Sequence, residues 1–177
     1  MEIFIVGALV VALMIFVSTK IKKSAARAFV PELIERDEFN IAKPEGFMTP
    51  LETGRDGFLF EAYSREYGEK KARNIRCAQA FLTGAKNLNF DAECERAKKS
   101  AGKILSERVL ENGDGERVFL LESEEKGEDD FPVIVFRKIV ESRARGKTYD
   151  LKVSVLQSLR DVYIHKVNEM INSFRLK

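Results

Sequence analysis

The chain has 177 residues, with 30 lysines and arginines against 28 aspartates and glutamates, so its net charge is close to zero. Proteins dedicated to nucleic-acid binding carry a clear basic excess, and the balance of charges argues against nucleic acid as a partner. Two cysteines and one histidine are too few for a disulfide framework or for a zinc site of cysteine and histidine ligands. We therefore expect no metal and no cofactor.

The chain opens with an uncharged apolar run from Ile3 to Ser18. Its 16 residues give about 24 Å of helix, and continuation to Ile21 approaches the roughly 30 Å hydrocarbon core of a bilayer. Lys20 can extend its amine to the membrane surface. The run predicts a single-pass transmembrane anchor, with the lipid bilayer as partner of residues 3–21. A buried core helix is one alternative.

A cleaved signal peptide is the other alternative, because Ala26-Arg27-Ala28 has the form of a cleavage site. However, only Glu2 precedes the apolar run, and positive charge follows it instead. The basic residues behind the run are Lys20, Lys22, Lys23 and Arg27. The positive-inside rule then places the C-terminal domain in the cytoplasm at the cell membrane. An extracytoplasmic domain is the alternative orientation.

The expected organisation is an anchor with its basic flank over residues 1–23, a tether over 24–37 and one domain over 38–177. About 140 residues suffice for a hydrophobic core. Pro31 interrupts the tether, since proline lacks an amide donor. A short second helix is then expected to pack on the domain through Phe29, Leu33 and Ile34.

Most of the domain is predicted to be strand. The expected strands are 38–42, 58–64, 73–82, 104–111, 117–123, 131–141 and 147–157. The alternation is cleanest in the last, where Tyr149, Leu151, Val153 and Val155 share one side. An antiparallel sheet with one face buried gives this pattern.

Two helices complete the predicted fold. Asn89 or Asp91 caps a helix reaching about Gly102, by accepting bonds from its first amides. Its buried face is expected to hold Phe90, Cys94, Ala97 and Ala101. Ser158 is the candidate cap of a helix over 158–174, whose apolar stripe comprises Leu159, Val162, Tyr163, Val167, Met170, Ile171 and Phe174. The fold class is α+β, an αβα sandwich with six to seven mostly antiparallel strands and two main helices.

The residues indicate no enzyme. Cys77 and Cys94 both fall on predicted inward faces, and His165 lies off the apolar stripe of its helix, so a nucleophile relay between them is disfavoured. The sequence has neither a glycine-rich phosphate loop after a strand nor a Gly-x-Ser-x-Gly elbow. A bridge between the two cysteines remains open if the domain lies outside the cytoplasm.

Two charged groups form the candidate interaction surface. The run 122–130 holds six carboxylates but lacks the ligand order of an EF-hand loop, so a solvated turn between two strands is favoured over a divalent-cation site. Our hypothesis is that this turn is a docking surface for a basic partner. The basic group that follows either touches anionic headgroups or, as we prefer, pairs with the acidic run across one sheet edge. The surface comprises Glu122, Glu124, Glu125, Glu128, Asp129, Asp130, Arg137, Lys138, Arg143 and Arg145.

Two segments carry a resemblance to a known family. Residues 39–47, FNIAKPEGF, resemble the opening strand and the Pro-x-Gly-aromatic turn of the PsbP family, which includes extrinsic photosystem subunits and a related Ran-binding import factor. Tyr149-Asp150-Leu151 and the helix end Ile171-Asn172-Ser173-Phe174 resemble its last strand and helix. The resemblance covers residues 38–176. It implies a central antiparallel sheet between helices and a non-catalytic role in binding or stabilising an assembly.

The predicted function is thus a membrane-anchored, non-catalytic domain that binds an unknown protein or stabilises an assembly. The alternative is an extracytoplasmic ligand-binding or accessory domain tethered to the membrane.

Overall fold

The structure is a computed structural model that describes residues 11–20, 27–50, 57–68, 75–86, 88–111, 116–127 and 130–177. Residues 11–20 form a helix with exposed apolar side chains, and the rest of the predicted anchor, residues 3–10 and 21, lies outside the described ranges. Within those ranges no helix has the length and apolar character needed to cross a membrane. The prediction of a transmembrane helix, and of a single-pass cell-membrane location, is therefore wrong.

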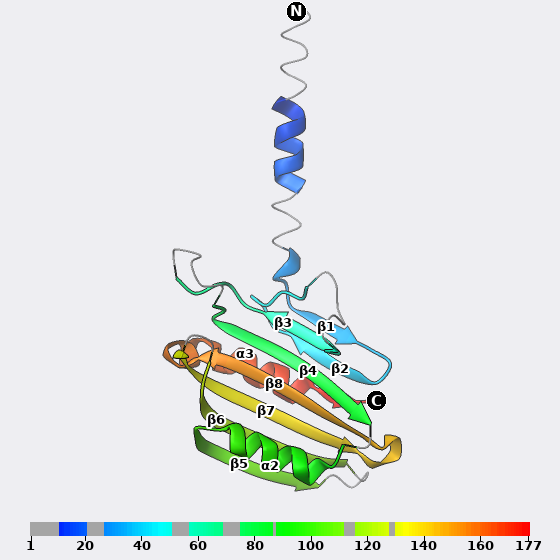
Figure 1. The fold of residues 1–177 in the computed structure, drawn as a ribbon. Coiled ribbons are helices and arrows are strands. Elements are labelled where there is room, and N and C mark those ends of the chain that lie inside the picture. Colours follow the sequence, from blue (N-terminus) through cyan, green and yellow to red (C-terminus); the bar gives the residue numbers. More distant parts are fainter. Residues whose placement is uncertain are drawn as a thin grey trace, which may run out of the picture.

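The described residues form two antiparallel sheets (Figure 1). The strands are β1 (Glu32–Glu35), β2 (Phe39–Lys43), β3 (Phe60–Tyr63), β4 (Ala78–Lys86), β5 (Lys103–Glu111), β6 (Glu116–Lys126), β7 (Pro132–Ser142), β8 (Lys147–Leu156) and β9 (Arg175–Leu176). Six of them form a sheet in the order β3-β4-β8-β7-β6-β5, and three form a sheet in the order β1-β2-β9. The predicted α+β class with a mostly antiparallel sheet is confirmed.

Strand β8 lies inside the larger sheet, with β4 on one side and β7 on the other. Its alternate residues Tyr149, Leu151, Val153 and Val155 are at most 1% exposed, as their spacing predicts. Hydrogen bonding to both neighbours satisfies the backbone of β8, and the apolar face supplies the centre of the main core. The strand with the clearest alternation of apolar residues, β8, thus lies in the interior of the sheet, where its apolar face is buried.

The helix α3 (Arg160–Ser173) covers this apolar face and contacts β2, β7 and β8. Its buried residues Tyr163, Val167 and Met170 recur at spacings of four and three, which is one face of a helix. The ring of Phe47 meets that of Tyr163 edge to face at 6.0 Å. Because β2 also contacts α3, the helix lies between the two sheets.

The helix α2 (Phe90–Ser100) packs on the opposite face of the six-stranded sheet (Figure 1). Phe90, Cys94 and Ala97 form a second core cluster with side chains of β6 and β7. The side chain of Asn89 accepts bonds from the amides of Asp91 and Ala92, so Asn89 is the predicted N-cap. The helices therefore cover opposite faces, as the sandwich prediction requires.

Several local predictions fail. Helix α2 ends at Ser100, so Ala101 is not on its buried face, and β4 begins at Ala78 instead of residue 73. Residues 32–35 form strand β1 instead of a short helix, because Leu33 and Ile34 pair with β2 and cover its edge. Ser158 lies in a 3-10 turn and caps nothing, since α3 begins only at Arg160 with no side-chain cap. Val162 is 65% exposed, because the face of α3 that meets the sheet is narrower than the predicted stripe.

The side chain of Lys138 in β7 is buried beneath α3. Lys138 is 6% exposed, and its amine donates to the carbonyl oxygens of Ile171 at 2.9 Å and Phe174 at 2.8 Å. These carbonyls end α3, where a helix leaves acceptors without partners and favours positive charge. Burial lowers the pKa of Lys138 to about 8, and nearby Arg175 acts in the same direction. Lys138 therefore attaches the end of α3 to β7.

We predict that Lys138 makes stability depend on alkaline pH. Its pKa is about 8 in the folded chain and near 10.5 in the unfolded chain, so between these values the unfolded chain holds more protons. Stability therefore rises with pH in this window. Denaturant unfolding of the wild type and of Lys138→Met is measured at pH 7 and pH 10. From pH 7 to pH 10, the free energy of unfolding of the wild type should rise relative to that of the variant. A constant difference between the two would contradict the assignment.

We also predict that Asn89→Ala destabilises the protein by about 1 kcal/mol, because two first-turn amides of α2 lose their acceptor. Asn168→Ala is the matched control, since Asn168 is exposed in the middle of α3. Alanine favours helix there, so no loss is expected. Urea unfolding of the two variants measures the difference, and equal midpoints would argue against the cap.

Candidate interaction surface

The predicted acidic turn is largely strand, because β6 continues to Lys126. Glu122 receives Arg160 at 2.8 Å on the face that α3 covers, whereas Glu125 receives Lys152 at 3.1 Å on the other face. Asp130 pairs with Lys126 at 3.7 Å. Glu124 pairs with Lys103 at 3.8 Å, and Glu128 and Asp129 lie outside the described residues. The carboxylates are thus divided between two faces of the sheet.

The basic half of the predicted surface is also dispersed. Arg137 pairs with Asp150 at 3.6 Å on the α2 face, where burial raises the pKa of Asp150, while Lys138 points into the α3 face. Arg143 contacts Glu141 at 3.8 Å. Arg145 donates to the carbonyl oxygens of Glu38 and Lys177. The structure does not gather these ten residues on one surface, and their role in binding a partner stays a prediction.

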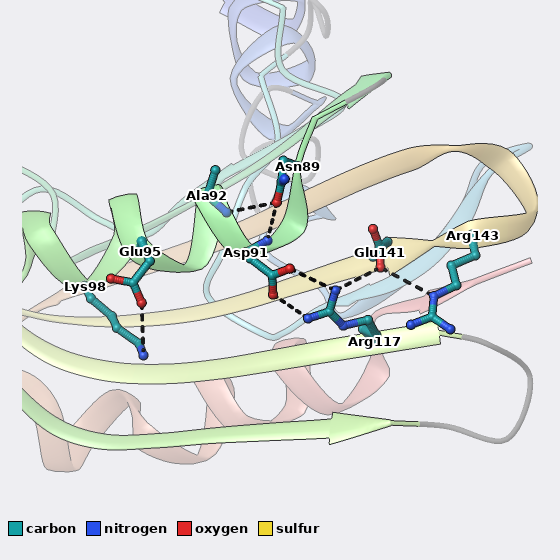
Figure 2. Close-up of polar contacts among 8 residues, drawn as sticks. All are labelled: Asn89, Asp91, Ala92, Glu95, Lys98, Arg117, Glu141 and Arg143. Carbon is teal, nitrogen blue, oxygen red and sulfur yellow. Dashed lines mark hydrogen bonds and ion pairs between the residues drawn. The ribbon is translucent and has the colours of Figure 1, made fainter.

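A cluster around Arg117 fixes α2 to the sheet (Figure 2). The guanidinium of Arg117 binds Asp91 at the start of α2 and approaches Glu141 of β7 at 3.6 Å. It also lies 4.3 Å from the ring centre of Phe90, a cation–π contact. Hydrogen bonding to Arg117 lowers the pKa of Asp91. The start of α2 is therefore held over β6 and β7.

A hollow of about 270 Å³ lies beside α2 on the same face of the sheet. Its floor includes Phe81, Val135 and Leu156, and its charged lining includes Glu125 and Lys152. These two groups bind each other, and Ser123 donates to the second oxygen of Glu125 at 3.2 Å. Since the charges already satisfy one another, the hollow does not define a ligand.

The strand with the most exposed apolar side chains is β5, at one edge of the larger sheet. All nine of its residues are exposed. The large apolar ones are Ile104, Leu105, Val109 and Leu110, between 39% and 59% exposed. Only β6 pairs with β5 among the described strands, so one row of its backbone groups has no strand partner. Such an edge is a template for another strand.

Strand β5 presents two different faces to solvent. Its register with β6 opposes Val109 to Phe119 and Glu107 to Leu121, which places these residues on the α2 face. Arg108 and Leu110 lie on the other face, since neighbouring strand residues alternate. A register shift between Ile104 and Ser106 leaves Leu105 without a partner. The sequence predicts this strand at residues 104–111 but not its position at the edge of the sheet.

The sulfhydryl groups lie apart, in different cores. Cys77 is 2% exposed in the core under α3, whereas Cys94 is 8% exposed in the core under α2. Both are free, and the sheet separates them. Burial raises the pKa of the Cys94 thiol to about 12, so this sulfur is protonated at neutral pH. His165 is exposed on α3, as its spacing predicts.

The fold has known counterparts. The chain resembles the cyanobacterial PsbP protein (CyanoP) of Synechocystis sp. PCC 6803, with a TM-score of 0.55 and 10% identity, over 84% of this chain and 94% of that one. It resembles the Ran-binding protein Mog1p of Saccharomyces cerevisiae, with a TM-score of 0.52 and 12% identity, over 84% and 96%. It also resembles LpqN of Mycobacterium tuberculosis, with a TM-score of 0.54 and 10% identity, over 84% and 91%.

The predicted resemblance to the PsbP family is confirmed at the level of fold: the domain has the PsbP and Mog1-like architecture. No family model matches the sequence, and no curated protein matches it.

We predict that neither thiol reacts in the folded protein. Both side chains are buried, and the pKa of Cys94 is raised to about 12, so no reactive thiolate is accessible at pH 8. Iodoacetamide labelling followed by mass measurement should add nothing to native protein and two groups in guanidinium. Val162→Cys is the positive control, because position 162 is 65% exposed. Labelling of folded wild type would contradict the prediction.

Proposed function

We propose that this protein is a non-catalytic protein-interaction domain that binds an extended segment of another protein along the free edge of β5. The occupant adds a strand antiparallel to β5, and its backbone amides and carbonyls bond the row that β6 leaves unpaired. Its side chains then cover Val109 on one face and Leu110 on the other.

The observation that carries this proposal is the exposure of β5. Sheets usually protect an edge with short strands, proline, charged side chains or a β-bulge, since unprotected edges aggregate. Strand β5 has charged residues and a bulge at Leu105, but it is also long and apolar. Here the edge strand has nine residues, four of them large, apolar and exposed. An added strand removes that apolar surface from water and completes the backbone bonds. An assembly role follows from this chemistry, because a bound segment joins two proteins without any reaction.

The reactive groups of the described chain support the absence of catalysis. Cys94 is a protonated, buried thiol, and Cys77 packs in the other core. No group of metal-ligating side chains occurs in the described ranges. Mog1p, which shares the fold, is named for binding Ran, a protein partner, and that is consistent with an interaction role here.

Site-specific crosslinking tests the proposal. A photoreactive amino acid replaces Leu110 in the full chain, produced in its own cells. In a control it replaces Val162, which is also apolar and exposed but lies on α3. We expect irradiation to join position 110, and not position 162, to a defined segment of another protein.

The segment identified in this way is then made and added to purified, isotope-labelled protein. Hydrogen exchange should slow for the amides of β5 and stay unchanged for those of β3, the opposite edge of the sheet. Equal crosslinking at positions 110 and 162, or unchanged exchange in β5, would refute the proposal.

A further inference from the structure

We infer that the strand bound by β5 belongs to a different protein and carries an acidic residue opposite Arg108. On its N-terminal side, this acidic residue is preceded by two apolar residues, which lie opposite Val109 and Leu110. This inference rests on the proposed function and names the partner of the same edge. It follows from the charges that β5 leaves unmatched and from the geometry of antiparallel pairing.

Among the described residues, Arg108 is the charged residue of β5 that has neither an ion pair nor an oppositely charged neighbour across from it in β6. Glu111 also lacks an ion pair within the described ranges, but it lies opposite Arg117 of β6. Glu107 is bound by Lys98 of α2 at 3.4 Å, and Lys103 lies 3.8 Å from Glu124. In the described part of the chain Arg108 has no ion pair, and its neighbour across the strand pair is the apolar Leu120. Leu110 flanks it on the same face. A carboxylate on an added strand would meet Arg108 directly, and opposite charges placed across strands stabilise the pair.

A second copy of this chain does not supply that carboxylate. In a symmetric antiparallel pair the twofold axis is perpendicular to the sheet, so opposed residues share a face. The β5 residues on the face of Arg108 are Lys103, Ser106, Arg108 and Leu110. The acidic residues Glu107 and Glu111 lie on the α2 face, opposite Leu121 and Arg117 of β6.

The central self-pairing registers bring like charges together as well. When the twofold axis passes beside Glu107, Glu107 lies opposite Glu107 of the second copy. When it passes beside Arg108, the two copies of Arg108 lie opposite each other. Pairing about Val109 opposes Glu107 to Glu111 twice. Like charges directly opposite each other destabilise a strand pair. The sequence of β5 therefore disfavours self-association and selects a strand of another composition.

Two synthetic peptides test the charge pattern. The first is Thr-Thr-Val-Val-Glu-Thr-Thr, blocked at both ends, which in antiparallel pairing places glutamate opposite Arg108 and valines opposite Val109 and Leu110. The second has lysine in place of the glutamate. Amide chemical shifts of β5 in isotope-labelled full chain give the affinities. We expect the glutamate peptide to bind about fivefold more tightly, because an attractive cross-strand pair replaces a repulsive one.

Charge reversal of the protein provides the decisive comparison. In Arg108→Glu the preference should invert, so that the lysine peptide binds more tightly. Arg143→Glu is the matched control, since Arg143 is exposed outside β5 and its reversal changes net charge equally. The control should keep the preference of the wild type, and far-ultraviolet circular dichroism checks that each variant is folded.

The outcomes separate the inference from the proposed function. Equal affinity of both peptides for the wild type, with shifts confined to β5, would overturn the charge pattern and leave strand addition standing. A different outcome is that neither peptide binds, and that light scattering shows a dimer that Val109→Lys abolishes. A second copy of the chain would then be the occupant of the edge, and both the inference and the proposed function would be overturned. A preference that survives Arg108→Glu would also overturn the inference.

Discussion

The architecture depends on the burial of one face of the β4-β8-β7 strands beneath α3. Tyr149, Leu151 and Val153 of β8 are fully buried there, and the strands on either side keep the backbone hydrogen-bonded. The end of α3 meets this face through the amine of Lys138, which bonds two of its terminal carbonyls. The smaller sheet then covers α3 from outside, through β2. Helix, core and both sheets are thus fixed by one buried surface.

The second face of the sheet is covered less completely, and this difference creates the candidate site. Arg117 holds the start of α2 over β6 and β7 by binding Asp91 and Glu141 (Figure 2). Lys98 reaches as far as Glu107 of β5, but the apolar side chain of Val109 stays exposed. On the opposite face α3 contacts β7 and β8, and its Arg160 reaches Glu122 of β6, but Leu110 of β5 stays exposed. An uncovered edge strand is the consequence of where two helices pack.

The sequence predicts most of the elements, because alternation and capping are local properties. The buried side of β8 and the Asn89 cap of α2 follow directly from the residues. The errors arise where distant contacts decide: Leu33 joins β2 as a strand, and Val162 faces away from a sheet whose position the sequence does not define. The candidate site was missed for the same reason. The order of strands in a sheet determines which strand lies at the edge. The local sequence around Val109 is equally compatible with an edge strand and with a central strand.

The charges of β5 reconcile an exposed edge with a folded protein that must avoid pairing with itself. Apolar residues on both faces favour any added strand, whereas charges along the strand discriminate among them. Glu107 and Arg108 lie at its centre, so every well-overlapped antiparallel copy brings one of them against a like charge or opposes Glu107 to Glu111. The bulge at Leu105 adds a second obstacle to self-pairing. Because of it, Ile104 and Leu110 lie on different faces of the sheet, so Ile104 of one copy cannot pack against Leu110 of the other. The same residues that make β5 a binding edge therefore restrict what can bind there.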